Sequence, residues 1–542
     1  MMGKTGAADG EKRPKCPNCG KRMTKGARTA GGRIRWQCRI WAGEKTSGRY
    51  CYSTTDASAK PEARQRNGRW YDATGERTFR RPLDGAHTYI ITAAQNATPI
   101  HETFWACLKV AAKHRGAEIL ICPLRYKNPT SHWTASQANA DTWASEIQPY
   151  LWNVRKRLNE NLVLLGDIKV QPTAVEPLTG FDAISGSSSA ILGHTKMQMK
   201  SVATPSNKMA KILTTTGACT VENYTDSRAG AQGKFHHSLS ALIVEVKGRK
   251  FFIRQLHYDR KTESVTDLDT RYYAGRVTKA PRPLALVMGD SHVDAIDPQV
   301  ESATFGPDGI VPTLKPRHLV WHDTLDSYAV NPHHNGNPFN AIAKMQAGRS
   351  SIEDEVRRAC EFVRKRTTGD TISVIVPSNH DDMLARWIVA HDWRTNPVNA
   401  SFYLRAALEM VKETRMTEIG TEYPSPFPMI FPSMVESMEG IRLLKPDESF
   451  TLGGIELSMH GDRGPGGARG SIRNLRRIGI KSIIGHSHCP GIEEGTVQVG
   501  TSTNLRLEYT VGSPSAWLNA HCILHDDSKR QLIVIVGGKW RA

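Results

Sequence analysis

Long apolar runs are missing from this sequence. No stretch approaches the roughly 20 consecutive apolar residues that a transmembrane helix requires. The first residues, MMGKTGAADGEKRPK, are polar and charged, unlike the apolar core of a secretory signal peptide. These absences argue against a membrane span and predict a cytoplasmic protein.

The sequence also lacks the cysteine pattern of a disulfide framework. Six of its ten cysteines are scattered singly: Cys107, Cys122, Cys219, Cys360, Cys489 and Cys522. The other four lie within the first 51 residues: Cys16, Cys19, Cys38 and Cys51. This distribution favours one metal cluster and ordinary buried thiols in a reducing compartment.

Acidic residues are outnumbered, and the imbalance is local. The chain has 72 Lys and Arg against 53 Asp and Glu, a net charge of +19. Residues 1–82 alone hold 20 basic and 7 acidic residues, so +13 of the excess lies there. Such a concentration is typical of a polyanion binder, and a solvated arm is the alternative.

The chain has 542 residues, which is more than a single domain usually contains, since domains average roughly 150 residues. We predict three parts: residues 1–82, an α/β domain over 83–280, and a carboxyl-terminal domain over 281–542. The segments "HTYIITAAQ" and "AEILICPL" predict parallel strands, and the intervening segment predicts a helix that begins at Pro99 behind Thr98. The stretch "AISGSSSAILGH" favours a loop.

The amino-terminal cysteines predict a structural zinc site. Cys16-Pro-Asn-Cys19-Gly has the spacing of a zinc knuckle, and "RIRWQCR" resembles the return strand of a zinc ribbon. The predicted ligands of one Zn²⁺ are Cys16, Cys19, Cys38 and Cys51; four free thiols in a basic arm are the alternative. Neighbouring candidates for phosphate and base contacts are Arg33, Arg35, Trp36 and Arg39.

Five strand-like runs in the last 260 residues end in polar clusters: "LALVMGDSH", "HLVWHD", "ISVIVPSNHD", "IELSMHGD" and "SIIGHSH". Strands of α/β sheets place ligands at their carboxyl ends, so these five ends can pool their side chains in one crevice. The pooled residues are Asp290, His292, Asp323, Asn379, His380, His460, His486 and His488. Carboxylate, amide and imidazole together suit borderline divalent metals.

The order of these motifs resembles the calcineurin-like metallophosphoesterase family. They stand as "GDSH", "HDTLD", "SNHD", "MHGD" and "GHSH" over about 200 residues, all in the family's order. The resemblance implies a carboxyl-terminal four-layer α/β/β/α sandwich with two catalytic metals. The chain departs from the family pattern at His322 and Ser378, where the family usually has glycine.

The same resemblance implies a role for each motif residue. Asp323 would bridge the two metals. Asp290, His292 and His488 would complete the first site, and Asn379, His460 and His486 the second. His380 would stand beside the metals and protonate or stabilise the leaving oxygen. Manganese is the expected metal, with magnesium, iron and zinc as alternatives; ordinary surface loops or a decayed site are the alternative interpretation of the motifs.

The basic arm and the zinc ribbon favour a nucleic-acid substrate, so we expect a metal-dependent DNA nuclease. The alternatives are a phosphatase or phosphodiesterase acting on nucleotides or phosphoproteins, and a DNA-binding adaptor with an inert phosphoesterase domain. Candidate contacts to the DNA backbone near the metals are Arg463, Arg473, Arg476 and Arg477; a solvated helix face explains the last three equally well.

A narrower resemblance rests on the zinc-binding arm, the segment "AQNATPIHETF" and the terminal phosphoesterase motifs. Together they are similar to the pre-early DNA-degrading proteins of T-odd coliphages. This resemblance implies degradation of host DNA in the host cytoplasm, dependence on manganese and assembly into a homo-oligomer.

Overall fold

The computed structural model describes residues 86–126, 142–205, 208–334, 336–418 and 420–542, with residue 15 and residues 22–28, 34–38 and 52–54. The chain divides into two compact units, Met1–Phe79 with Trp152–Val154, and Arg80–Leu151 with Arg155–Ala542. In the first unit, β1 (Thr24–Arg28), β2 (Ile34–Cys38) and β3 (Tyr52–Thr54) form a small antiparallel sheet in the order β1-β2-β3.

The second unit begins with the predicted strand–helix–strand segment. β4 (Ala86–Gln95) and β5 (Glu118–Leu124) are parallel, and α2 (Glu102–Arg115) connects them. The predicted helix start was wrong: the N-cap is His101, whose Nδ1 accepts a hydrogen bond from the Phe104 amide. This side chain takes the place that we had assigned to Thr98.

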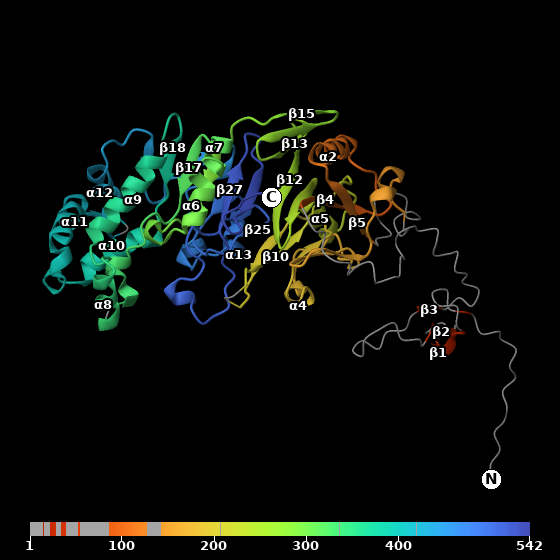
Figure 1. Ribbon diagram of the computed structural model, residues 1–542, viewed down its shortest axis with the longest axis horizontal. Coiled ribbons are helices and arrows are strands. Elements are labelled where there is room, and N and C mark those ends of the chain that lie inside the picture. Colours follow the sequence, from red (N-terminus) through yellow and green to blue (C-terminus); the bar gives the residue numbers. More distant parts are fainter. Residues whose placement is uncertain are drawn as a thin grey trace, which may run out of the picture. The chain divides into compact units, whose positions relative to one another are not determined.

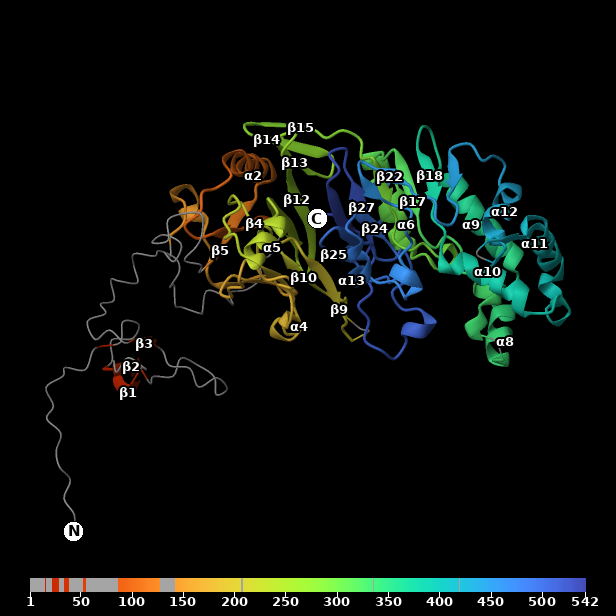
Figure 2. The ribbon, with the colours of Figure 1, turned by 180° about the vertical axis from the view of Figure 1, so that it is seen from behind.

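Five antiparallel strands extend β4 and β5 into a seven-stranded sheet of order β15-β14-β13-β12-β11-β4-β5. The added strands are β11 (Ser240–Lys247), β12 (Lys250–Asp259), β13 (Ser264–Asp267), β14 (Thr270–Tyr273) and β15 (Arg276–Lys279). α2 packs against β13 and β14 (Figure 2).

A mixed ten-stranded sheet joins segments that lie far apart in the sequence. Its order is β22-β23-β24-β26-β25-β9-β10-β8-β7-β6. One half comprises β6 (Arg155–Asn159), β7 (Leu162–Leu165), β8 (Ser189–Leu192), β9 (Met199–Val202) and β10 (Lys211–Thr215). The other half comprises β22 (Thr451–Leu452), β23 (Ile455–Glu456), β24 (Ser482–Ile484), β25 (Gly491–Glu493) and β26 (Thr496–Gln498). The halves meet where Met199 and Lys200 of β9 pair with β25.

A mixed six-stranded sheet has the order β21-β18-β17-β16-β27-β28. Its strands are β16 (Ala285–Val287), β17 (His318–Trp321), β18 (Ile372–Ile375), β21 (Ile441–Leu443), β27 (Ala520–Leu524) and β28 (Arg530–Val534). The first four are parallel, and β27 runs antiparallel to β16. A large apolar core that includes Trp321, Val356 and Phe402 joins this sheet to the helices gathered beside β17 and β18 (Figure 1).

The second unit also contains further α-helices, one hairpin and several short 3₁₀ helices. These α-helices are α4 (Phe181–Ile184), α5 (Arg228–His236), α6 (Pro298–Phe305), α7 (Ile310–Leu314), α8 (Pro338–Gln346), α9 (Ile352–Arg366), α10 (Asn379–Ala390), α11 (Ala400–Glu413), α12 (Pro426–Ile430) and α13 (Ile472–Leu475). β19 (Arg415–Thr417) and β20 (Gly420–Glu422) form the hairpin.

Several sequence-based expectations can be compared with this architecture. The fold is α/β, as predicted, and its larger sheets mix parallel and antiparallel strands. The stretch 183–194 is not a loop throughout, because β8 lies within it. The six scattered cysteines are free thiols, and no helix in the described part of the chain is long and apolar enough to cross a membrane.

Candidate metal centre

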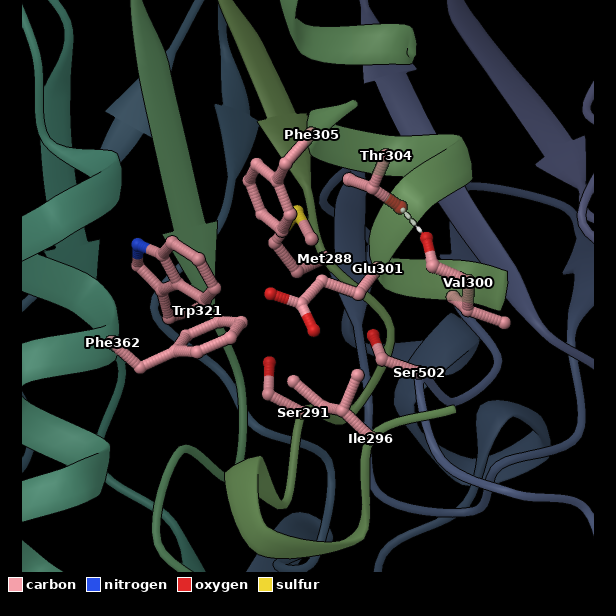
Figure 3. Close-up of a pocket in the computed structure, with 10 residues that line it drawn as sticks. All are labelled: Met288, Ser291, Ile296, Val300, Glu301, Thr304, Phe305, Trp321, Phe362 and Ser502. Carbon is pink, nitrogen blue, oxygen red and sulfur yellow. Dashed lines mark hydrogen bonds between the residues drawn. The ribbon is translucent and has the colours of Figure 1, made fainter. Parts of the chain in front are cut away.

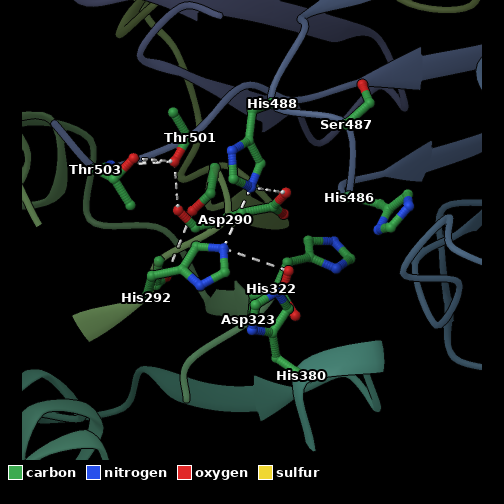
Figure 4. A network of polar contacts seen from close by, with 12 residues as sticks. Asp290, His292, His322, Asp323, His380, His486, Ser487, His488, Thr501 and Thr503 are labelled. Atoms are coloured by element: carbon green, nitrogen blue, oxygen red, sulfur yellow. Dashed lines mark hydrogen bonds and ion pairs between the residues drawn. The ribbon is translucent and has the colours of Figure 1, made fainter. Parts of the chain in front are cut away.

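The five predicted motifs converge, but their strands belong to two sheets. "GDSH", "HDTLD" and "SNHD" follow β16, β17 and β18 of the six-stranded sheet. "MHGD" and "GHSH" follow β23 and β24 of the ten-stranded sheet. The polar side chains at these strand ends therefore lie close together, as expected, although the strands come from two sheets. They meet where the two sheets approach each other (Figure 4).

One group of side chains gathers around Asp290, His292 and His488. The Nε2 atom of His488 lies 3.2 Å from Asp290 Oδ2 and 3.2 Å from His292 Nε2 (Figure 4). Asp323 Oδ2 is 3.6 Å from His292 Nε2. All four residues are buried, so their lone pairs converge in a region shielded from solvent.

A second group gathers around Asn379, the first residue of α10. Its Oδ1 lies 3.0 Å from His460 Nε2 and 3.0 Å from His486 Nδ1. The Nε2 atom of His460 is also 3.1 Å from Asp323 Oδ2. Asp323 thus contacts both groups, the position that a bridging carboxylate would occupy.

The backbone is left-handed at four of these residues. The φ angles are +38° at His292, +45° at Asp323, +76° at His486 and +58° at His488. Residues other than glycine adopt this backbone conformation at a cost of about 1–3 kcal/mol each, and such residues cluster at functional sites. The conformation also explains why the rings of His486 and His488 lie in different groups, although residues two apart in extended chain would point the same way.

The carboxylates and imidazoles shift one another's pKa values. Burial alone would lower the pKa of His292, but nearby Asp326 and Asp323 outweigh it and raise this pKa to about 9. Burial would also lower the pKa of His460, but the negative charge of Asp323 outweighs burial and raises this pKa to about 9. Burial lowers the pKa of His380 below its ordinary value, against the attraction of Asp323.

The buried donor atoms fit metal ions. Asp290 Oδ1, Asp323 Oδ1 and His488 Nδ1 are buried and have no hydrogen-bond partner within the described residues, and Asp290 Oδ2 has only the His488 contact described above. Buried polar atoms are normally satisfied. Ligand atoms of Asp290, Asp323 and His460 lie within 4.8 Å of one another, as do those of His292, Asp323 and His488. Oxygen and imidazole donors at these separations could hold divalent metals.

Asp326 is a residue of the site whose role the sequence reasoning missed, although it ends the "HDTLD" motif. Its Oδ1 lies 3.1 Å from His292 Nδ1 and 3.5 Å from His380 Nδ1. Its backbone carbonyl is 2.8 Å from the same His380 nitrogen. Asp326 therefore orients two imidazoles, and its spacing of three residues from Asp323 was the available signal.

His322 fills the position where the resembled family has glycine. It is buried between the two sheets, with its Nδ1 3.4 Å from His460 Nδ1. Burial lowers the pKa of His322 to about 4, so the ring is neutral near pH 7. Gly485 lies against this ring, because a Cβ at Gly485 would stand 3.0 Å from His322 Cγ.

The predicted arginines are differently engaged. Arg476 is largely buried and pairs with Glu176, Glu493 and Glu494. Arg463 is exposed and pairs with Asp382. Arg473 and Arg477 are both exposed, on the segment that includes α13.

The predicted zinc ligands fall mostly outside the described residues. Cys16, Cys19, Cys51, Arg33 and Arg39 are among the residues that are not described, and the side chains of Cys38 and Arg35 in β2 are not described either. Trp36 is buried within β2. The zinc site and its nucleic-acid contacts stay predictions.

A small cavity lies on the far side of the "GDSH" loop. Met288, Phe305, Trp321 and Phe362 line it, together with Ser291 (Figure 3). Its volume is about 10 Å³, close to the space that one water needs. It is a packing gap and not a substrate site.

Fold and site together define a mixed α/β protein with buried histidine and aspartate groups that could hold metal ions. No family model matches the chain. The chain is similar to Protein A1 of Escherichia phage T5, with 29% identity over 472 residues, 84% of this chain and 83% of that protein. It is thus a distant homologue of a phage protein, over a length that includes most of the described fold.

Proposed function

We propose that this protein is a metal-dependent DNA nuclease that hydrolyses phosphodiester bonds with two divalent metals. The observation that carries the proposal is the buried convergence of carboxylate, amide and imidazole donors in two groups that share Asp323. The two contributing sheets and the core beside α9 and α10 support a calcineurin-like four-layer sandwich.

The proposed ligands follow the two groups. Asp290, His292 and His488 would hold one metal, Asn379, His460 and His486 the other, and Asp323 would bridge them. Two such cations would neutralise the phosphodiester oxygens and acidify the attacking water. Manganese is the proposed metal.

The protein itself orients the proton donor. The Nδ1–H of His380 donates to the Asp326 carbonyl at 2.8 Å, which leaves Nε2 as the nitrogen available to a substrate. The ring packs edge-on against His292, with centroids 4.5 Å apart. In its imidazolium form the ring would carry a second proton on Nε2, which would pass to the leaving oxygen of the cleaved strand.

DNA is the proposed substrate because the positive charge of the chain is concentrated in one segment of the sequence. The +13 charge of residues 1–82 would attract a polyanion, and a zinc ribbon there would add phosphate contacts. Arg463, which pairs with Asp382 of α10, and Arg473 and Arg477 would contact the backbone of the strand. The relationship to a phage protein supports a phage origin; action on host DNA and assembly into a homo-oligomer are further parts of the proposal.

The test is plasmid cleavage by the metal-stripped protein after addition of manganese, magnesium or zinc. Asp323→Ala and His380→Ala should each lose cleavage while binding DNA as the wild type does. Asp370→Ala is the matched control, because this carboxylate is exposed and pairs only with Arg282 among described residues. Cleavage that persists in Asp323→Ala would refute the mechanism, and hydrolysis of small phosphodiesters alone would favour a phosphodiesterase.

A further inference from the structure

A pocket lies beside the candidate metal centre, on the outer side of the loop that precedes β27. Its volume is about 300 Å³, at the lower end of the range for small-molecule sites. Its apolar lining comes from Met209, Ala210, Leu505, Leu518, Ile535 and Val536, and its remaining lining includes Lys208, Arg506, Thr510, Trp517 and Asn519. An apolar floor with one large aromatic ring suits a flat, partly polar group.

The pocket wall is attached directly to the metal centre. The ring of Trp517 contacts the His488 ring edge-on, with centroids 4.2 Å apart. The Leu518 amide donates to the His488 carbonyl at 3.2 Å. A group held on Trp517 would therefore lie one side chain away from a proposed metal ligand.

Asn519 links the same wall to the first ligand group. Its Nδ2 donates to the carbonyls of Thr501 and Thr503, at 3.1 Å and 2.8 Å. Thr501 in turn donates from Oγ1 to the Asp290 carbonyl at 3.0 Å. Because both Asn519 amide protons are used, its carbonyl oxygen is the atom left to accept from a ligand amino group.

Two cations border the pocket without a carboxylate partner. Lys208 and Arg506 are exposed, and neither side chain makes an ion pair or hydrogen bond with any residue that the structure describes. This differs from Arg463 and Arg476, whose guanidinium groups are already paired. Unpaired cations beside an aromatic ring are the elements of a single-stranded nucleic-acid site.

We propose that this pocket binds one nucleotide of a single DNA strand next to the bond that is cut. The base would stack on Trp517, its amino group would meet Asn519 Oδ1, and the flanking phosphates would contact Lys208 and Arg506. This inference rests on the proposed function and adds a subsite for an unpaired nucleotide.

Binding can be measured without cleavage, in the full-length protein with a chelator present. A single-stranded oligonucleotide carrying iodouracil is irradiated, and the cross-linked peptide is identified by mass spectrometry. We expect the cross-link within the peptide that contains Trp517. Cross-links that map only elsewhere would overturn the assignment.

Charge variants test the phosphate contacts. In the combined Lys208→Ala and Arg506→Ala variant, the slope of log affinity against log salt should fall by about 1.4, since each phosphate contact on a single strand contributes about 0.7. Arg357→Ala combined with Lys365→Ala on α9 removes the same charge from exposed positions and should leave the slope unchanged. Equal slopes in both double variants would contradict the proposal.

Stacking is tested at Trp517. Trp517→Ala should weaken binding by a factor of roughly 5 to 150, and Trp517→Phe should restore most of it. Metal binding is measured in parallel, because Trp517 contacts His488. If a free deoxynucleotide competes as well as the strand, the pocket is a mononucleotide site and the strand assignment fails. If plasmid cleavage fails while the Trp517 cross-link persists, the nuclease proposal falls and the nucleotide site stands.

Discussion

Replacing Gly485 by alanine should disable the metal centre while leaving the fold intact. Gly485 follows β24 and precedes the two histidines of "GHSH". A Cβ at this position would stand 2.3 Å from Asp290 Oδ1, and 3.0 Å and 3.2 Å from His322 Cγ and Cβ. Neither Asp290 nor His322 is exposed to solvent, so neither can move outward freely.

The size of the effect follows from these distances. An ordinary contact begins near 3.4 Å, so the Asp290 carboxylate must move by about 1 Å. Metal–ligand distances are confined to about ±0.2 Å, so this displacement should remove Asp290 from the ligand set. We expect manganese affinity to fall by about 100-fold, or about 2.7 kcal/mol. The overpacking itself should cost about 1–3 kcal/mol of stability.

The measurement is calorimetric titration of manganese into chelator-stripped protein. Thermal unfolding of the metal-free variant shows whether it still folds cooperatively. Gly495→Ala is the matched control, because this glycine lies between β25 and β26 of the same sheet and its added Cβ would meet only the Ile480 carbonyl closely, at 3.1 Å. Wild-type manganese affinity in Gly485→Ala would refute the role that we assign to Asp290.

Three further predictions concern other buried polar groups. Asp326→Asn should weaken manganese binding by about 10-fold, because the carboxylate that orients His292 loses its charge; a titration identical to wild type would show that the contact is incidental. Burial lowers the pKa of His194 to about 4, so the fold favours the neutral ring. As the pH falls from 6.5 towards 4, the free energy of unfolding should therefore decrease by roughly 3 kcal/mol. In urea unfolding, His194→Gln should show a smaller decrease over this range. Arg254 is buried between Glu245 and Asp267, so Arg254→Met should lower the free energy of unfolding by about 3–5 kcal/mol, and a urea midpoint close to wild type would contradict this.

The convergence of these polar side chains could be predicted because each motif joins a polar residue to a strand end. The apolar runs before Asp290, Asp323 and Asn379 became β16, β17 and β18. The supporting contacts could not be predicted in the same way. Asp326 acts through the side chains of His292 and His380, and such contacts depend on backbone turns that the sequence leaves open.

The ten-stranded sheet was also beyond sequence reasoning. β22 and β23 have two residues each, and β24, β25 and β26 have three, too few to show a period of two. Partners such as Met199 and Ile492 are separated by nearly 300 residues, and their pairing is decided by tertiary packing. The composition of residues 183–194 favoured a loop for the same reason, although β8 lies there between two neighbouring strands.

The pairing of β9 with β25 has a consequence for how this protein can be inherited or engineered. The "GHSH" motif lies immediately before β25, and β25 completes its backbone hydrogen bonding on β9. Arg476 with Glu176, and Lys196 with Glu494, form ion pairs across the same junction. A gene fragment cut at residue 281 would encode a sheet with an open edge beside the "GHSH" loop. We therefore expect that recombination can transplant this site only as a pair of distant segments, residues 155–215 together with the carboxyl-terminal half.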